Sequence, residues 1–247
     1  MWRFEIHDVL TSTLDYCRQR ASLNEESGLV VIAHEQSAGR GTRGRKWSGS
    51  RDNLALTFLL YGDEEGRFLS SLPFMTALAL YDSCMACLAS VAREMDVGIS
   101  PFQLKWPNDL LLNGGKLSGI LIESGHNERG QWISVGTGVN LASAPQIEGR
   151  RTSFLGEVCH PPHPVIFARI LTKMMTKWLT HWQKEGNDVI YKAWLKRAHP
   201  VGTRLSIASA HNVMSGLFDG IDSYGRLLLR QDDGMVVSVA TGDVFCL

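Results

Sequence analysis

The spacing of apolar residues changes once along this chain, near His199 and Pro200. Before that point helix-like and strand-like segments alternate, whereas residues 201–247 have no helical period and show short strand-like runs between glycine-containing turns. Such a run of short strands is typical of a small β-barrel-like module. A chain of 247 residues is long enough for one large core and a small second domain. We therefore expect two domains, residues 1–199 and residues 200–247.

The pattern of apolar and turn-forming residues also predicts the elements of each part. In the first part we expect helices at Thr13–Arg20, Pro73–Met95, Val165–Glu185 and Asp188–Ala198. Strands are expected at Leu29–His34, Leu54–Tyr61, Gln103–Trp106, Leu117–Ser124 and Gln131–Val135, the last two forming a hairpin. In the second part we expect strands at Arg204–Ala208, Val213–Ile221, Arg226–Leu229 and Met235–Ala240.

Charge and hydropathy limit the classes of partner. Lys+Arg and Asp+Glu each number 25, so the formal net charge is zero. Proteins that bind nucleic acid usually have a basic excess, so we expect no nucleic-acid partner. The N-terminus lacks the pattern of a signal peptide, and the apolar run Asn53–Tyr61 is too short to span a bilayer. We expect a cytoplasmic protein with no membrane partner.

The five cysteines do not predict a disulfide framework, because their number is odd and their spacing irregular. Cys84 and Cys87 form a C-x-x-C, which could be redox-active or half of a zinc site. Both lie beside a stripe of apolar residues at helical spacing, which favours buried helix cysteines. His160 and His163 lie among prolines and predict a stiff loop rather than a metal site. No prosthetic group is expected.

Residues Gly39–Trp47 form the sharpest local feature, with three glycines, three arginines and one lysine in nine positions. Glycines let the backbone approach a ligand, and arginines present forks of donors to phosphate or carboxylate oxygens. The segment therefore suits an anionic ligand such as a nucleotide. It is neither a P-loop nor a Rossmann turn. The alternative interpretation is a flexible basic surface loop.

Three further segments carry polar groups at strand ends: Lys105–Asp109, Gly115–Glu123 and Gly136–Asn140. Taken singly they could be a turn, a strand with a charged residue at its entrance, and another turn. Together with Gly39–Trp47, and in this order, they resemble the G-R-G-R-x-G-R-x-W, K-W-P-N-D, G-K-L-x-G-I-L-x-E and G-x-G-x-N motifs of the biotin–protein ligase family. The resemblance covers nearly the whole chain.

The resemblance implies an α+β fold, with a mixed sheet and packed helices like that of class II aminoacyl-tRNA synthetases, plus a small SH3-like C-terminal β domain. It implies a ligase that converts biotin and ATP, with Mg²⁺, into biotinyl-5′-AMP and then biotinylates a lysine of a biotin carboxyl carrier protein. Because the pattern begins by Ser12, we expect the monofunctional form without an N-terminal DNA-binding domain. Whether the chain forms a homodimer is left open.

The resemblance also assigns roles to residues. Lys116 and Arg40 are expected to be catalytic, placing positive charge where two anions meet. Biotin-binding positions are Ser12, Thr13, Gln36, Gly39, Arg40, Lys116, Gly119 and Leu121. ATP- or adenylate-binding positions are Arg43, Arg45, Trp47, Asn108, Asp109 and Asn140, with Asp109 also the candidate Mg²⁺ ligand.

Two positions depart from the family pattern. Leu14 follows Ser12-Thr13 where an asparagine is common, and Thr42 stands where an arginine is common. Two alternative functions are a lipoate–protein ligase of the same fold and, less favoured by the neutral charge, a biotin-responsive transcriptional regulator.

Overall fold

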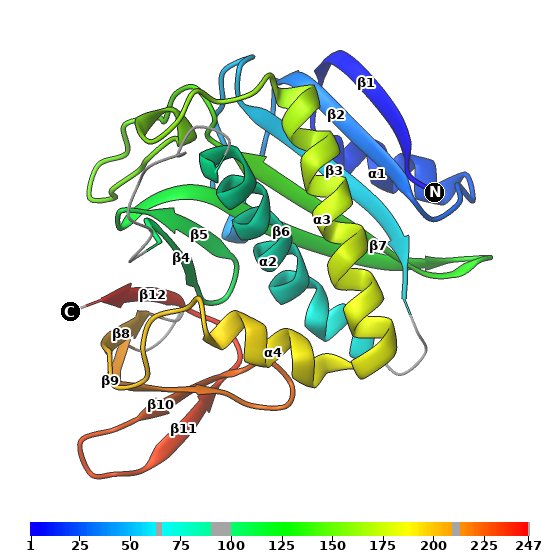
Figure 1. The fold of residues 1–247 in the computed structure, drawn as a ribbon. Helices are drawn as coiled ribbons and strands as arrows, with labels where there is room; N and C mark the ends of the chain where they lie inside the picture. The colour runs from blue at the N-terminus through cyan, green and yellow to red at the C-terminus, as the bar shows by residue number, and fades with distance from the viewer. Residues whose placement is uncertain (63–65, 90–99, 209–212, 247) are drawn as a thin grey trace.

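The computed structural model describes residues 1–62, 66–89, 100–208 and 213–246. These residues form a seven-stranded mixed sheet and a separate five-stranded antiparallel sheet (Figure 1). The large sheet has the order β1-β2-β3-β7-β6-β5-β4, and only β1 and β2 pair in parallel. This architecture confirms the predicted mixed sheet with packed helices and a small C-terminal β domain. The division between residues 199 and 200 stays a prediction; the strands of the second sheet begin at Arg204.

The large sheet consists of β1 (Arg3–Leu10), β2 (Leu29–Gln36), β3 (Leu54–Tyr61), β4 (Phe102–Lys105), β5 (Asp109–Leu112), β6 (Gly115–Asn127) and β7 (Gly130–Val139). The helices are α1 (Thr13–Ser22), α2 (Arg67–Ala89), α3 (Pro164–Glu185) and α4 (Asn187–Leu195). The small sheet consists of β8 (Arg204–Ala208), β9 (Val213–Ile221), β10 (Leu227–Arg230), β11 (Val236–Val239) and β12 (Asp243–Cys246).

Helices cover both faces of the large sheet, as the side chains of β2 make clear. Side chains alternate between the two faces of a strand. Val30 and Ile32 join the main core, which is formed with α2 and α3, whereas Leu29 and Val31 pack with Cys17 of α1 in a second cluster. The continuous apolar run of β2 follows from this burial on both faces.

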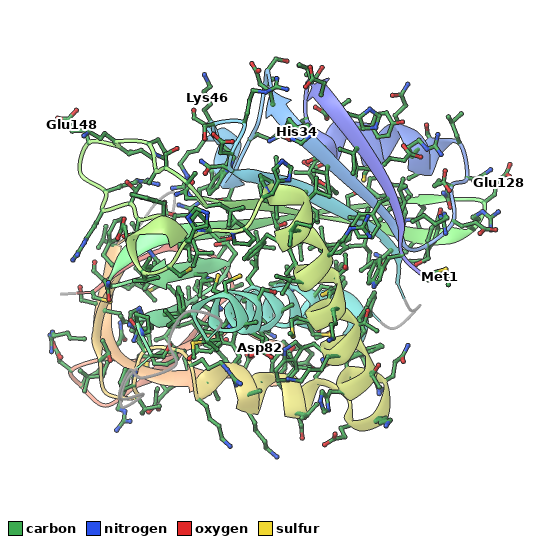
Figure 2. All side chains as sticks on the ribbon, turned by 45° about the horizontal axis from the view of Figure 1, so that its top comes forward. Met1, His34, Lys46, Asp82, Glu128 and Glu148 are labelled. Atoms are coloured by element: carbon green, nitrogen blue, oxygen red, sulfur yellow. The ribbon has the colours of Figure 1, made fainter. Side chains whose placement is uncertain are left out.

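Helix α2 begins at Arg67, so the predicted start at Pro73 was wrong and the proline lies inside the helix. The predicted end, Met95, falls outside the described residues. By length and composition α2 could cross a membrane, although 61% of its most apolar window is buried inside the fold. Burial against the sheet and α3 explains the apolar character of this helix (Figure 2).

Three strands were not predicted: β1, β5 and β12. Strand β1 lies at the edge of the sheet and has mixed polar and apolar side chains, so its pattern is weak. Strands β5 and β12 have four residues each, too few for a clear period. The position of β5 matters for the site, because Asp109 is the first residue of this strand and does not lie at the end of a turn.

The two sheets share one hydrophobic core. Leu205 and Phe218 of the small sheet belong to the same buried cluster as the side chains between α2 and the large sheet. The indole of Trp106 donates to the carbonyl of Gly225 at 3.0 Å, and Phe74 packs against the same glycine. The C-terminal sheet is therefore held firmly against the part of the molecule that carries the candidate site.

Candidate active site

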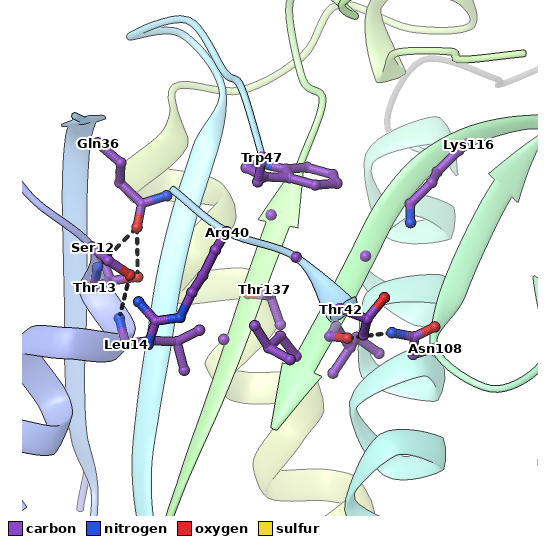
Figure 3. Close-up of a pocket in the computed structure, with 16 residues that line it drawn as sticks. Ser12, Thr13, Leu14, Gln36, Arg40, Thr42, Trp47, Asn108, Lys116 and Thr137 are labelled. Atoms are coloured by element: carbon purple, nitrogen blue, oxygen red, sulfur yellow. Dashed lines mark hydrogen bonds between the residues drawn. The ribbon is translucent and has the colours of Figure 1, made fainter. Parts of the chain in front are cut away.

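The loop Gly39–Trp47 lies over the strands β6 and β7 and, with the start of α1, encloses a pocket (Figure 3). The pocket brings together most of the predicted site residues: Ser12, Thr13, Gln36, Arg40, Trp47, Asn108, Lys116, Gly119 and Leu121. Both positions that depart from the family pattern, Leu14 and Thr42, also line it. The residues come from segments far apart in the sequence, so the fold creates a single site from four separate motifs.

One end of the pocket presents neutral hydrogen-bond donors. Ser12 is the N-cap of α1, and its Oγ accepts from the backbone N–H of Leu14 at 3.2 Å, which leaves the hydroxyl proton free to donate. The Oε1 of Gln36 accepts from both the N–H and the hydroxyl of Thr13, at 2.8 and 3.1 Å. The amide oxygen of Gln36 is thus occupied, and its NH₂ group is available to donate to a ligand.

Thr57, a fully buried residue of β3, supports this end from below. Its hydroxyl donates to the hydroxyl of Thr13 at 2.8 Å. Thr13 then uses its own proton on Gln36, so the three side chains form a chain with one direction of donation. A buried polar chain of this kind fixes side-chain orientation when every member is satisfied. Thr57 was not among the predicted site residues, because one threonine in an apolar strand carries no signal that distinguishes it in the sequence.

The middle of the pocket has a flat floor and an aromatic roof. Gly119 of β6 and Gly138 of β7 are directly opposite each other across the two strands. The indole of Trp47 lies on this pair: a Cβ added to Gly138 would meet the ring at 2.1 Å, and one added to Gly119 at 3.3 Å. The glycines therefore make room for the ring, and Trp47 joins the loop to the floor of the pocket.

Lys116 and its carboxylate partner form the other end. The Nζ of Lys116 lies 2.6 Å from Oδ1 of Asp109, whose side chain is only 12% exposed, and Lys105 lies 3.7 Å from the other oxygen. Two ammonium groups thus face the Asp109 carboxylate. This arrangement does not fit Asp109 as a magnesium ligand, and among the described residues no group of three or more His, Cys, Asp or Glu side chains could hold a metal ion.

Arg40 enters the pocket between these two ends. Its guanidinium contacts Asp15 of α1 at 2.8 Å and both carboxylate oxygens of Glu123 of β6 at 2.9 and 3.0 Å. Burial alone would lower the pKa of Arg40, but its hydrogen bonds with Asp15 and Glu123 raise the pKa above its ordinary value. The side chain is a permanent cation whose orientation two carboxylates determine.

Arg43 and Arg45 are outside the set of residues that line the pocket. Both guanidinium groups contact Asp243, the first residue of β12, at 2.9 and 2.8 Å. Arg45 also donates to the hydroxyl of Thr42 at 2.8 Å. Their predicted role toward a nucleotide stays a prediction, since in this structure they join the loop to the C-terminal sheet.

The remaining predicted residues support the backbone around the site. The amide of Asn140 donates to the carbonyls of Ser153 and Lys116. Asn108, although it lines the pocket, donates to the carbonyl of Ile120 at 2.6 Å. At Gly39 a Cβ would lie 2.6 Å from the carbonyl oxygen of Trp47, so only glycine permits the close approach of the two ends of the loop.

Two groups set aside in the sequence lie away from the pocket. Cys84 and Cys87 are buried on α2, where burial raises the pKa of Cys87 to about 11. His163 caps α3 by accepting from the N–H of Val165. These positions agree with the interpretation of both groups as structural.

Comparisons with known proteins agree with this geometry. Residues 7–140 match the Biotin/lipoate A/B protein ligase family, and residues 206–247 match the Biotin protein ligase C terminal domain. A curated biotin–[acetyl-CoA-carboxylase] ligase from Paracoccus denitrificans is 38% identical over 226 residues, which are 87% of this chain and 89% of that protein. The chain belongs to the biotin protein ligase family.

Solved structures of biotin protein ligases have the same fold. The enzyme from Aquifex aeolicus, in complex with biotin and ATP, superposes with a TM-score of 0.79 at 21% identity, covering 99% of this chain and 98% of that chain. The enzyme from Leishmania major, in complex with biotinyl-5-AMP, gives 0.66 at 24% identity over 97% and 99% of the two chains. The fold of this biotin protein ligase is thus the class II synthetase-like mixed sheet that the motifs implied.

Proposed function

We propose that this ligase joins biotin to AMP in the pocket beneath Trp47 and transfers the biotin to a lysine of a biotin carboxyl carrier protein. The observation that carries the proposal is the order of chemistry along one pocket: neutral donors, then a glycine floor, then fixed cations. Biotin has the same order of parts, with a polar ureido ring, an apolar tail and a carboxylate.

The donor end matches the ureido carbonyl. The free proton of Ser12 and the NH₂ of Gln36 are both donors, and a carbonyl oxygen has two lone pairs to accept them. The tail would lie beside the Trp47 ring, along the strand wall at Leu121, where burying apolar surface stabilises it by about 25 cal/mol per Å². Thr57 acts through Thr13 as a positioning residue for this end.

The cationic end serves the first reaction. A carboxylate oxygen of biotin attacks the α-phosphorus of ATP, the bond to the bridging oxygen breaks, and pyrophosphate leaves with that electron pair. Both reactants are anions, so fixed positive charge at their meeting point lowers the barrier. Lys116 and Arg40 supply that charge. Magnesium would arrive on the phosphates of ATP, and we assign it no protein ligand.

In the second reaction the neutral amine of the acceptor lysine attacks the carbonyl carbon of the anhydride. The carbon–oxygen bond to the phosphate breaks, AMP leaves, and the nitrogen loses a proton. The chain needs no covalent intermediate for this step, because positioning two reactants alone can accelerate a reaction by many orders of magnitude. We also propose that the acceptor is a biotin carboxyl carrier protein, that the ligase acts in the cytoplasm, and that it has no DNA-binding role.

Mass spectrometry of an acceptor domain tests the function directly. The purified chain is incubated with MgATP and a biotin carboxyl carrier domain, with either biotin or lipoate. We expect a biotin adduct on one lysine and no lipoyl adduct. Pyrophosphate release with lipoate, or an unmodified acceptor in the presence of biotin, would contradict the proposal.

A further inference from the structure

Asp243 links the C-terminal sheet to the loop that roofs the pocket, although the two segments are about 200 positions apart in the sequence. Its carboxylate contacts both Nη atoms of Arg45, at 2.8 to 3.0 Å, and Nη1 of Arg43 at 2.9 Å. Two parallel contacts between a guanidinium and a carboxylate fix direction as well as distance. The loop is therefore attached at its outer end to the second, C-terminal sheet.

The backbone of the loop makes this attachment effective at the pocket. The N–H of Gly41 donates to the carbonyl of Arg45 at 2.7 Å, and the N–H of Trp47 donates to the carbonyl of Gly39 at 2.9 Å. The loop is thus a small closed hairpin whose two sides move together. Arg45 at one position and Trp47 two residues later are parts of the same hairpin, so restraining the first restrains the roof.

The tip of the hairpin needs such a restraint. Arg43 has φ of 59° and ψ of 31°, a left-handed conformation that costs a non-glycine residue energy, and Gly44 follows with φ of 71°. The contact between Arg43 and Asp243 holds this tip in place. Arg45, which is paired with Asp243, also donates a hydrogen bond to the hydroxyl of Thr42, and Thr42 lines the pocket.

The charge on Asp243 is secure at neutral pH. Burial alone would raise the pKa of this carboxyl, but hydrogen bonds from Arg45 and the charges of Arg45, Arg43 and Arg150 lower the pKa below its ordinary value. Strand β12 itself is fixed by antiparallel pairing with β8, in which Asp243 lies opposite Ala208. The carboxylate is thus a charged group on a rigid strand.

We propose that Asp243 is a positioning residue that holds the Gly39–Trp47 hairpin closed over the pocket through Arg45 and Arg43. The consequence for the pocket rests on the proposed function; the attachment of the loop does not. The competing idea is that Asp243 only occupies a place that ATP phosphates take when they bind. The two ideas make opposite predictions for removal of the carboxylate.

Limited trypsin digestion of the intact, ligand-free chain tests the attachment. The informative bond is that between Lys46 and Trp47. Lys46 is exposed (Figure 2), and the ion pairs that Asp243 forms among the described residues involve Arg43 and Arg45 rather than Lys46. Trypsin cleaves where the chain opens locally, at a rate set by the open population. In Asp243→Asn we expect cleavage at this bond to be about tenfold faster, from the loss of a charge-assisted pair.

Two variants control the experiment. Asp243→Glu keeps the carboxylate and should be cleaved at close to the wild-type rate. Asp232→Asn removes another carboxylate of the small sheet, one that pairs with Arg204 at 3.1 Å on the surface, and should leave the rate unchanged. Equal cleavage of Asp243→Asn and wild type, or a failure of Asp243→Glu to restore protection, would overturn the proposal.

Release of labelled biotinyl-adenylate from the preformed complex extends the test to the pocket. Asp243→Asn should release it about tenfold faster, with the maximal rate of adenylate synthesis changed less than its retention. Tighter ATP binding in Asp243→Asn would instead identify Asp243 as a phosphate substitute and refute the positioning role. If the wild-type chain makes no adenylate, the proposed function fails, while the digestion result still decides whether Asp243 holds the loop.

Discussion

The two ends of the pocket are built on different principles. At the donor end, Ser12, Thr13 and Gln36 direct short neutral side chains by hydrogen bonds among themselves and with Thr57. From the middle of the pocket to the cationic end, each positive group already has a carboxylate partner. Lys116 pairs with Asp109 and Arg40 with Asp15 and Glu123, and in the loop outside the lining Arg43 and Arg45 pair with Asp243.

This difference indicates how each end meets its ligand. The donor end has unused protons and needs no rearrangement. The cationic end must share its cations between protein carboxylates and incoming anions, so ligand binding there is an exchange of partners. We therefore expect substitutions at the cationic end to change reaction rates most, and substitutions at the donor end to change affinity.

The largest effect is expected from Lys116→Ala. Loss of one preorganised group that stabilises developing charge typically costs about 10²–10³-fold in rate, so pyrophosphate release with biotin and ATP should fall by that factor. The matched control is Lys105→Ala, which removes the other ammonium near Asp109 from a position outside the pocket lining. Adenylate synthesis at the wild-type rate in Lys116→Ala would remove Lys116 from the mechanism.

Lys116→Ala should also lower the free energy of unfolding. Asp109 would lose its closer ammonium partner, at 2.6 Å, and keep only Lys105 at 3.7 Å while remaining nearly buried, which typically destabilises a fold by about 1–3 kcal/mol. The double variant Lys116→Ala with Asp109→Asn removes the poorly compensated carboxylate charge. We expect thermal unfolding to return toward the wild-type temperature in the double variant, with no return of activity. Recovery of both together would show that Lys116 acts only through stability.

Thr42→Arg tests whether the cationic end lacks one charge. Thr42 lines the pocket at the position where the family motif has arginine, and a charge-assisted contact to phosphate is worth about 1.5–3 kcal/mol. The variant should release labelled adenylate about tenfold more slowly at low salt, and the effect should shrink at high salt because exposed charges are screened. Thr42→Gln provides a neutral side chain of similar length. If both variants release adenylate at the same rate, charge at position 42 has no role.

Thr57→Val tests the donor end. The substitution keeps the shape of the side chain but removes the proton given to Thr13, so the Thr13 hydroxyl that donates to Gln36 is oriented less firmly. A neutral hydrogen bond contributes about 1 kcal/mol, which predicts biotin binding about fivefold weaker by calorimetry, with the maximal rate changed little. Thr57→Ser keeps the hydroxyl and should bind like the wild type. A lower maximal rate at unchanged affinity would assign Thr57 to the cationic end instead.

The smallest effect concerns pH. The pKa of Asp243 is lowered in the folded protein, chiefly by Arg45, against the opposing effect of burial. Its contribution to stability is therefore complete above the ordinary aspartate pKa of about 4 and disappears as the pH falls through the lowered value. The unfolding temperatures of wild type and Asp243→Asn should differ at pH 6 and converge in stronger acid. A difference that is constant with pH would contradict this assignment.

The sequence predicted the residues of the pocket better than the partners of those residues. The four motifs place glycines and cations in a fixed order. All four contribute residues to one pocket in the structure, although Arg43 and Arg45 lie outside its lining. Glu123 stood within a quoted motif, yet its pairing with Arg40 depends on how β6 faces the loop. Asp15 and Asp243 come from a helix turn and a four-residue strand that no local pattern connects with the loop.

The elements of the fold were predictable where the apolar periodicity was strong. They were missed or misplaced where tertiary contacts determine the structure. Strand β2 and helix α3 have long apolar patterns and lie where expected. The edge strand β1 forms by parallel pairing with β2, and its own weak pattern of polar and apolar residues does not predict that pairing. Helix α2 extends past Pro73 toward its N-terminus because its first turns pack into the core, a preference that outweighs the local effect of proline.

The stacking of Trp47 on two opposed glycines has a consequence for engineering new substrate specificity. The floor of the pocket cannot be enlarged by substitution, since Gly119 and Gly138 have no side chains to shorten. The roof, in contrast, is a single large ring held by one hairpin. Replacing Trp47 with a smaller residue, rather than substituting residues of the sheet, would thus admit a bulkier biotin analogue. The variant enzyme would then accept a modified label that the wild-type enzyme rejects.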